Sequence, residues 1–272
     1  MTAQWVQLRG GETLVASHTG AWIQPPQAAA LGLWGSMPLS HTATLETTRH
    51  LLDGAMRAGE RGATATRQWP PSARAWALDL VDQWYTAHHS VALLPLAIER
   101  YESMQRSELV RFARHKLEEE AGHDRLALND LHALGYDPEA AVKEVPPGAT
   151  ARALVRYARH CLHGPEPVGF LGYIFMLERR VIRITDDELQ TLDRALPSGV
   201  EATSAVRAHA VEFDHQHVEE LVAFVSTLPA DDRTAVALAC FDTASLFSET
   251  ADPNRIDLER EQRLERVRKP TI

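Results

Sequence analysis

The chain of 272 residues is 44% apolar and 24% charged, an ordinary globular composition with enough length to bury a substantial core. Its formal net charge of −9 argues against a nucleic-acid partner, because phosphate binding needs clustered Lys and Arg. No apolar run reaches the roughly 18 residues that a membrane span needs. Residues 1–12 lack the pattern of a secretory signal. We therefore expect a cytoplasmic protein that does not cross a membrane.

The first seventy residues are interrupted by glycine and proline, as at Gly10-Gly11 and Pro25-Pro26. Such residues divide a chain into short pieces. We expect residues 1–70 to form an irregular arm with one short helix near 45–58, packed on the domain that residues 71–272 build.

Helical periodicity begins after Ser72, a typical N-cap residue, and Pro95 is expected to kink the chain within the first long helical stretch. No segment shows the strict alternation of a half-buried strand. The pattern predicts an all-α domain of about seven or eight helices. The predicted helical segments are 73–87, 91–103, 108–134, 149–162, 168–183, 186–196, 201–228 and 230–247.

Segment 201–228 contains a stripe of apolar residues at steps of three and four, and His217 lies in its middle. Asp214 is one helical turn earlier on the same side. A carboxylate and an imidazole that both face a core suggest a bound ion. A buried Asp–His hydrogen bond without a metal is the alternative.

Segment 168–183 repeats this anomaly, because Glu178 lies at the centre of its apolar face. Burying a lone carboxylate costs several kcal/mol unless it is paired or bound to a metal. The alternative partner is an arginine from another helix, such as Arg156.

Segment 108–134 supplies a third group. His115, Glu119 and His123 form an i, i+4, i+8 line, and Glu120 with His123 forms the E-x-x-H pair of bundle di-iron sites. A solvated helix face is the alternative. Gly122 costs about 1 kcal/mol relative to Ala inside a helix, which suggests that a neighbouring helix or a ligand approaches there.

Carboxylate and imidazole ligands without cysteine suit iron or manganese better than structural zinc. The two cysteines, Cys161 and Cys240, lack zinc-ligand spacing. We therefore expect Fe(II) to react with O2 and an oxidised iron species to act on a nearby small-molecule substrate.

At these residues the sequence resembles the heme-oxygenase-like di-iron oxidases and oxygenases, also called iron-containing redox enzymes. Three segments carry the resemblance, namely 117–137, 169–178 and 209–221. The resemblance implies a heme oxygenase-like helical bundle, an Fe(II)/Fe(III) centre, O2 as co-substrate, and N-oxygenation or oxidative C–C or C–H chemistry in specialised metabolism.

Carried over by position, the resemblance implies metal ligands at Glu119 or Glu120, His123, Glu178, Asp214 and His217, with His88, His115 and His209 as further candidates. His89, next to His88, is a related alternative. The sequence departs from the family pattern at Lys116, where a Glu is usual, and at Ala210, where a His is usual. The resemblance implies two irons with the second held weakly, and these departures leave a single iron open.

Other functions fit the same residues. A metal-free enzyme resembling the thiaminase-like and cofactor-oxidase branches would use the acidic and His side chains for acid–base work, and Lys116 and Ala210 favour it. A non-catalytic ferritin-like protein is a further alternative, with a heme-binding oxygenase as a lesser one. A homodimer is also an expectation.

Overall fold

The computed structural model describes residues 3–26, 43–61, 72–208, 214–250 and 257–269. The chain forms two compact units. Unit 1 consists of Met1–Ala63, Tyr157–Arg180 and Asp214–Glu249, and unit 2 consists of Thr64–Arg156, Val181–Phe213 and Thr250–Ile272. The predicted boundary at residue 70 lies within 62–71, outside the described residues.

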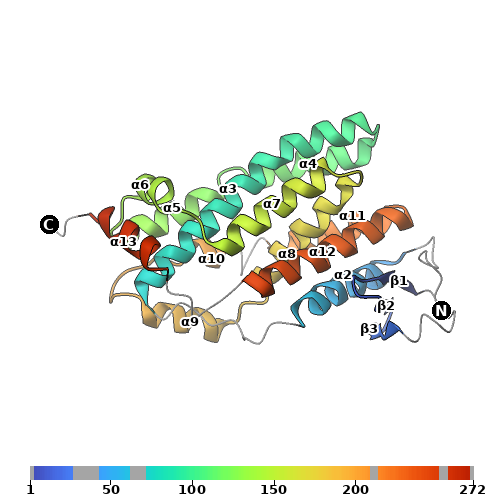
Figure 1. Ribbon diagram of the computed structural model, residues 1–272, viewed down its shortest axis with the longest axis horizontal. Coiled ribbons are helices and arrows are strands. Elements are labelled where there is room, and N and C mark those ends of the chain that lie inside the picture. Colours follow the sequence, from blue (N-terminus) through green and yellow to red (C-terminus); the bar gives the residue numbers. More distant parts are fainter. Residues whose placement is uncertain (1–2, 27–42, 62–71, 209–213, 251–256, 270–272) are drawn as a thin grey trace. The chain divides into compact units, whose positions relative to one another are not determined.

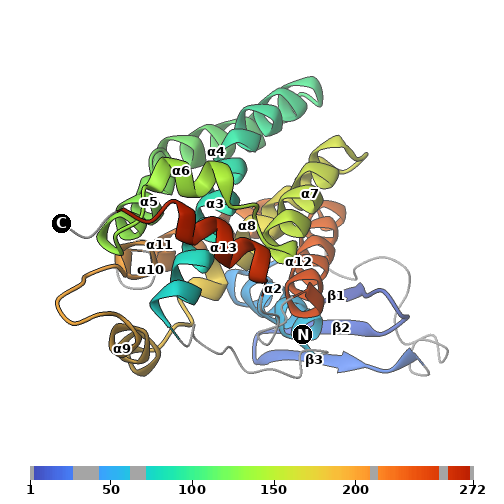
Figure 2. The ribbon, with the colours of Figure 1, turned by 60° about the vertical axis from the view of Figure 1, so that its left-hand side comes forward.

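Unit 1 combines an antiparallel sheet with helices. The strands, in the order β1-β2-β3, are β1 (Gln4–Gln7), β2 (Thr13–Ser17) and β3 (Gly20–Gln24). The helical elements are α2 (Leu45–Glu60), the second half of α7 (Ala149–His163), the 3-10 helix η1 (Pro167–Gly169), α8 (Phe170–Val181), α11 (Asp214–Thr227) and α12 (Ala230–Thr250). The sheet lies along α2 in both ribbon views (Figures 1 and 2).

The prediction of an irregular arm without strands was wrong for residues 4–24. All five residues of β2 are buried, as are the first three of β1. A strand buried along its whole length shows no polar–apolar alternation, and its period of two is therefore hidden. Gly10 and Gly11, with φ of +100° and +83°, lie between β1 and β2 in a conformation that favours glycine.

Close contacts and buried hydrogen bonds hold the sheet to the helices of unit 1. A Cβ added at Gly54 on α2 would lie 2.8 Å from a methyl carbon of Leu14 on β2, so glycine allows a close approach. The Gln4 side chain on β1 donates to Thr47 Oγ1 at 2.7 Å and accepts from Arg233 Nε at 2.7 Å. This buried network joins β1, α2 and α12.

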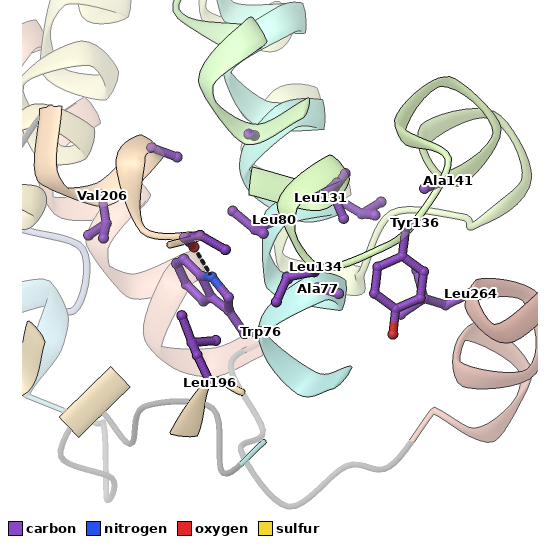
Figure 3. Close-up of a cluster of buried hydrophobic side chains, with 14 of the residues drawn as sticks. Trp76, Ala77, Leu80, Leu131, Leu134, Tyr136, Ala141, Leu196, Val206 and Leu264 are labelled. Carbon is purple, nitrogen blue, oxygen red and sulfur yellow. Dashed lines mark hydrogen bonds between the residues drawn. The ribbon is translucent and has the colours of Figure 1, made fainter. Parts of the chain in front are cut away.

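Unit 2 is helical. Its elements are α3 (Ala73–Ser103), α4 (Ser107–Glu119), α5 (Asp124–Ala133), α6 (Pro138–Glu144), the first half of α7, α9 (Asp186–Ala195), α10 (Ser204–Ala208) and α13 (Leu258–Arg266). Figure 3 shows its core around Trp76, which is fully buried and donates from Nε1 to the Ala202 carbonyl at 2.6 Å. Asp130 accepts from the backbone N–H groups of Ser204 and Ala205, at 3.0 and 2.8 Å.

The helical bundle is confirmed, with the sheet as an addition. The helix at 45–58 is confirmed as α2, and the two segments at 73–87 and 91–103 form one helix, α3, capped by the Ser72 hydroxyl. Helices α6 and α13 were not predicted, so the described residues contain more than seven or eight helices. The start signals of α6 were present, since Asp137 is its N-cap and Pro138 its first residue.

The prediction of one continuous helix over 108–134 was wrong. The chain turns at 120–123 between α4 and α5, with Gly122 at φ +90°. A Cβ at Gly122 would meet nothing within 4 Å. Its left-handed backbone therefore explains the glycine, rather than the close approach that the sequence suggested. Segment 201–228 forms α10 and α11 within its described residues, and 209–213 lies outside them.

Candidate metal centre

Glu178 on α8 and His217 on α11 form a buried pair in unit 1. Their residues are only 8% and 7% exposed. A carboxylate oxygen of Glu178 and a ring nitrogen of His217 lie within 4.8 Å of each other. Two ligands of one ion are roughly 3–4 Å apart when each bond is about 2.0–2.2 Å long, and the limit of 4.8 Å allows such a separation.

The buried pair follows from the apolar faces of its helices. Phe170, Leu171, Tyr173, Phe175 and Met176 of α8 are all buried, so the turn carrying Glu178 is drawn into the core. Arg179, next in the chain, instead donates to both carboxylate oxygens of Asp53, at 2.7 and 3.1 Å. The Arg179 side chain therefore pairs with Asp53 on α2.

The predicted ligands at the start of α11 are partly outside the described residues. Asp214 begins α11, and its side chain is not described. His209 and Ala210 lie within 209–213, outside the described residues. The ligands at Asp214 and His209 therefore stay predictions.

A second group of carboxylates and imidazoles lies in unit 2, around the end of α4. Glu119 Oε1 is 3.1 Å from His115 Nε2, and Glu120 Oε2 is 2.9 Å from His123 Nδ1. The other oxygen of each carboxylate faces Lys116 Nζ, at 3.1 Å from Glu119 Oε2 and 3.7 Å from Glu120 Oε1. The structure thus places these predicted acidic and His side chains close together, with the Lys116 ammonium between the two carboxylates.

The E-x-x-H pair has a different backbone from the one predicted. Glu120 is the C-cap of α4 and His123 the N-cap of α5. Because the chain turns between them, His123 does not continue the helical line of His115 and Glu119. The contact between Glu120 and His123 is made across the turn at 120–123.

His88 and His89 on α3 have other partners. His88 is half-exposed, stacks on Trp84 and lies 2.8 Å from Asp124 Oδ2. His89 Nδ1 lies 2.9 Å from the Tyr85 carbonyl. These contacts fit a surface pair better than ligands.

Neither cysteine has the character of a metal ligand. Burial raises the pKa of the Cys161 thiol to about 11 and holds the pKa of Cys240 well above its usual value. Metal ligation uses the thiolate, which such pKa values disfavour. The remaining donor set is oxygen and nitrogen, which fits iron or manganese.

A polar cluster that the sequence did not indicate lies in unit 1. Tyr157 donates its hydroxyl to Asp242 at 2.9 Å, and Arg9 lies 2.6 Å from the same oxygen. Burial raises the pKa of Asp242, and the Tyr157 hydroxyl lowers it. Asp242 lies on α12, 85 residues from Tyr157, so no local motif could have revealed the pair.

None of the helices in the described part of the chain has the length and apolarity to cross a membrane. No family model matches the chain, and no curated protein matches it significantly. Among solved structures, it is similar to a domain of unknown function with a heme oxygenase-like fold from Shewanella denitrificans OS217. The two share 20% sequence identity with a TM-score of 0.58, and the match covers 75% of this chain and 86% of that chain. The chain therefore has a heme oxygenase-like fold.

Proposed function

We propose that the protein is a non-heme iron, O2-dependent oxidase or oxygenase that acts on a small molecule. The observation that carries this proposal is the buried Glu178–His217 pair, with an oxygen and a nitrogen within 4.8 Å. A carboxylate and an imidazole on the inner faces of neighbouring helices are the ligand types of the iron sites that helical bundles build in their cores. The heme oxygenase-like fold is consistent with the proposal.

In the proposed site, Glu178 and His217 hold the iron together with the predicted ligand Asp214. Bound iron would supply a redox centre through which electrons pass from the substrate to O2. Glu178 contributes negative charge that favours the cation, and the buried faces of α8 and α11 limit access of water. In unit 2, Glu120 orients the His123 ring through the 2.9 Å contact between its Oε2 and His123 Nδ1.

The first test is an anaerobic Fe(II) titration of the wild-type protein and two variants. We expect wild type to bind iron and to change its optical absorption on exposure to O2. E178Q keeps the size of the side chain but removes its charge, and H217A removes the imidazole. Both should lower iron affinity by about 10-fold or more, since loss of a ligand or its support costs at least that much.

Q216A is the matched control, because Gln216 is an exposed neighbour of His217 on the same helix. It should bind iron as wild type does. Variant H123A reports on the group in unit 2, with H132A on α5 as its control. A wild-type protein that binds no iron would refute the proposal, as would E178Q and H217A variants that keep full affinity.

A metal-free acid–base enzyme is the second candidate. Lys116 favours it, because its ammonium already compensates the charge of Glu119 and Glu120. This candidate predicts no iron binding in wild type and no effect of O2 on the absorption spectrum. The same titration therefore separates the two functions.

A further inference from the structure

Lys116 is an almost completely buried cation. Its residue is 2% exposed, although it lies in a stretch of charged residues on α4. Lysine is rarely buried unless it is paired, because removing its ammonium from water is costly. Its burial therefore indicates that the surrounding carboxylates hold it in place.

The ammonium lies between two carboxylates. Its Nζ is 3.1 Å from Glu119 Oε2 and 3.7 Å from Glu120 Oε1. We call these two atoms the inner oxygens and the other oxygen of each carboxylate the outer one. The outer oxygens face imidazoles: Glu119 Oε1 is 3.1 Å from His115 Nε2, and Glu120 Oε2 is 2.9 Å from His123 Nδ1. The group thus has the charge pattern of a metal centre, with the lysine nitrogen at the position between the carboxylates.

We propose that Lys116 acts as a built-in cation that prevents a second metal ion from binding between Glu119 and Glu120, so that the protein binds one iron per chain. This inference rests on the proposed iron site. Nζ lies 3.1 Å from Glu119 Oε2 and 3.7 Å from Glu120 Oε1, so a metal ion between these two carboxylates would have to share that space with the ammonium. The charge of such an ion would also be repelled by the nearby ammonium.

The proposed effect of Lys116 is on the inner oxygens, Glu119 Oε2 and Glu120 Oε1. The proposed first iron is held by Glu178 and His217 of unit 1, whereas Lys116 lies in unit 2. Lys116 therefore sets the number of metal ions without removing the predicted ligands of the first.

The test is the number of Fe(II) equivalents bound per chain under anaerobic conditions, measured by iron analysis after removal of excess metal. Wild type should bind one. K116E replaces the ammonium by a carboxylate and should bind two. K116Q removes the positive charge with a smaller change in chemistry, and should bind a second equivalent more weakly than K116E.

K143E controls for the general effect of adding negative charge, since Lys143 is exposed on α6 of the same unit. It should stay at one equivalent. The double variant K116E/E178Q should lose the first equivalent and keep the second. Circular dichroism of each variant verifies that it is folded, and K116Q carries the test if K116E is not.

Two irons bound to wild type would overturn the inference and leave the proposed function intact. Folded K116E and K116Q that stay at the wild-type number would also overturn it. If wild type binds no iron, the proposed function fails, and the inference then stands only if K116E gains one equivalent.

Discussion

Glu178 and Lys116 are both charged and buried, but the sequence revealed only the first. Glu178 interrupts the apolar face of its helix, and an acidic residue at such a position is a visible anomaly. Lys116 is surrounded by charged residues, where lysine is normally solvated. Its burial depends on packing that local periodicity does not encode.

Glycine at position 172 allows α8 and α12 to pack closely within unit 1. A Cβ at Gly172 would lie 2.1 Å from the Val236 carbonyl oxygen and 2.7 Å from the Cys240 nitrogen. Because these are backbone atoms, the helices would have to separate. We expect Gly172→Ala to lower the free energy of unfolding by about 2–3 kcal/mol, measured by urea denaturation.

Gly164→Ala is the matched control, since a Cβ there would come no closer than 3.2 Å to the His160 carbonyl oxygen and its φ is not positive. We expect it to change the free energy of unfolding by less than about 1 kcal/mol. Equal effects of the two substitutions would show that close helix packing is not the reason for Gly172.

Among the elements, α13 shows how a terminal helix is attached to its unit. The Arg260 guanidinium lies 2.6 Å from Asp82 Oδ1 on α3 and donates to the Pro146 carbonyl at 2.8 Å. The Gly148 N–H donates to the same Asp82 oxygen at 2.7 Å. Burial nevertheless raises the pKa of Asp82 to about 6, so this carboxylate depends on its partners.

We expect Arg260→Met to destabilise unit 2 by about 1–3 kcal/mol, because it leaves the partly buried Asp82 carboxylate without its main counter-charge. Hydrogen exchange should show loss of amide protection in α13. Arg266→Met, on the exposed side of α13, should leave the protection unchanged. Unaltered exchange of α13 in the Arg260 variant would contradict the attachment.

At the scale of the whole molecule, each unit has its own buried aromatic residues. Trp5, Phe170 and Tyr173 are buried in unit 1, and Trp76 and Tyr101 in unit 2. The proposed iron site draws its two best-placed ligands, Glu178 and His217, from unit 1. Binding of iron should therefore stabilise the native chain by mass action.

We expect Fe(II) at about 100 times its Kd to stabilise wild type by roughly 2.7 kcal/mol, which corresponds to a rise of several degrees in Tm. Anaerobic thermal scans with and without Fe(II) measure this shift. E178Q should show little or none of it. An equal shift in E178Q would place the stabilising iron elsewhere.

The sequence by itself determined the helical class, the Ser72 cap that precedes α3, and the unusual positions of Glu178 and His217. These features depend on periodicity and capping, which are local properties of the chain. The turn at Gly122 was indicated by the glycine but interpreted as a close approach. The reason for the glycine is its left-handed backbone conformation, which only the three-dimensional structure shows.

Only the tertiary structure revealed the sheet at residues 4–24 and the ion pairs of Lys116. A strand that is buried along its whole length loses the polar–apolar alternation that identifies it. The residues next to Lys116 in the sequence are those expected around an exposed lysine, so they do not indicate its burial or its ion pairs. Both depend on which surfaces other segments cover. Burial is decided by the packing of residues far apart in the sequence, and no local pattern contains it.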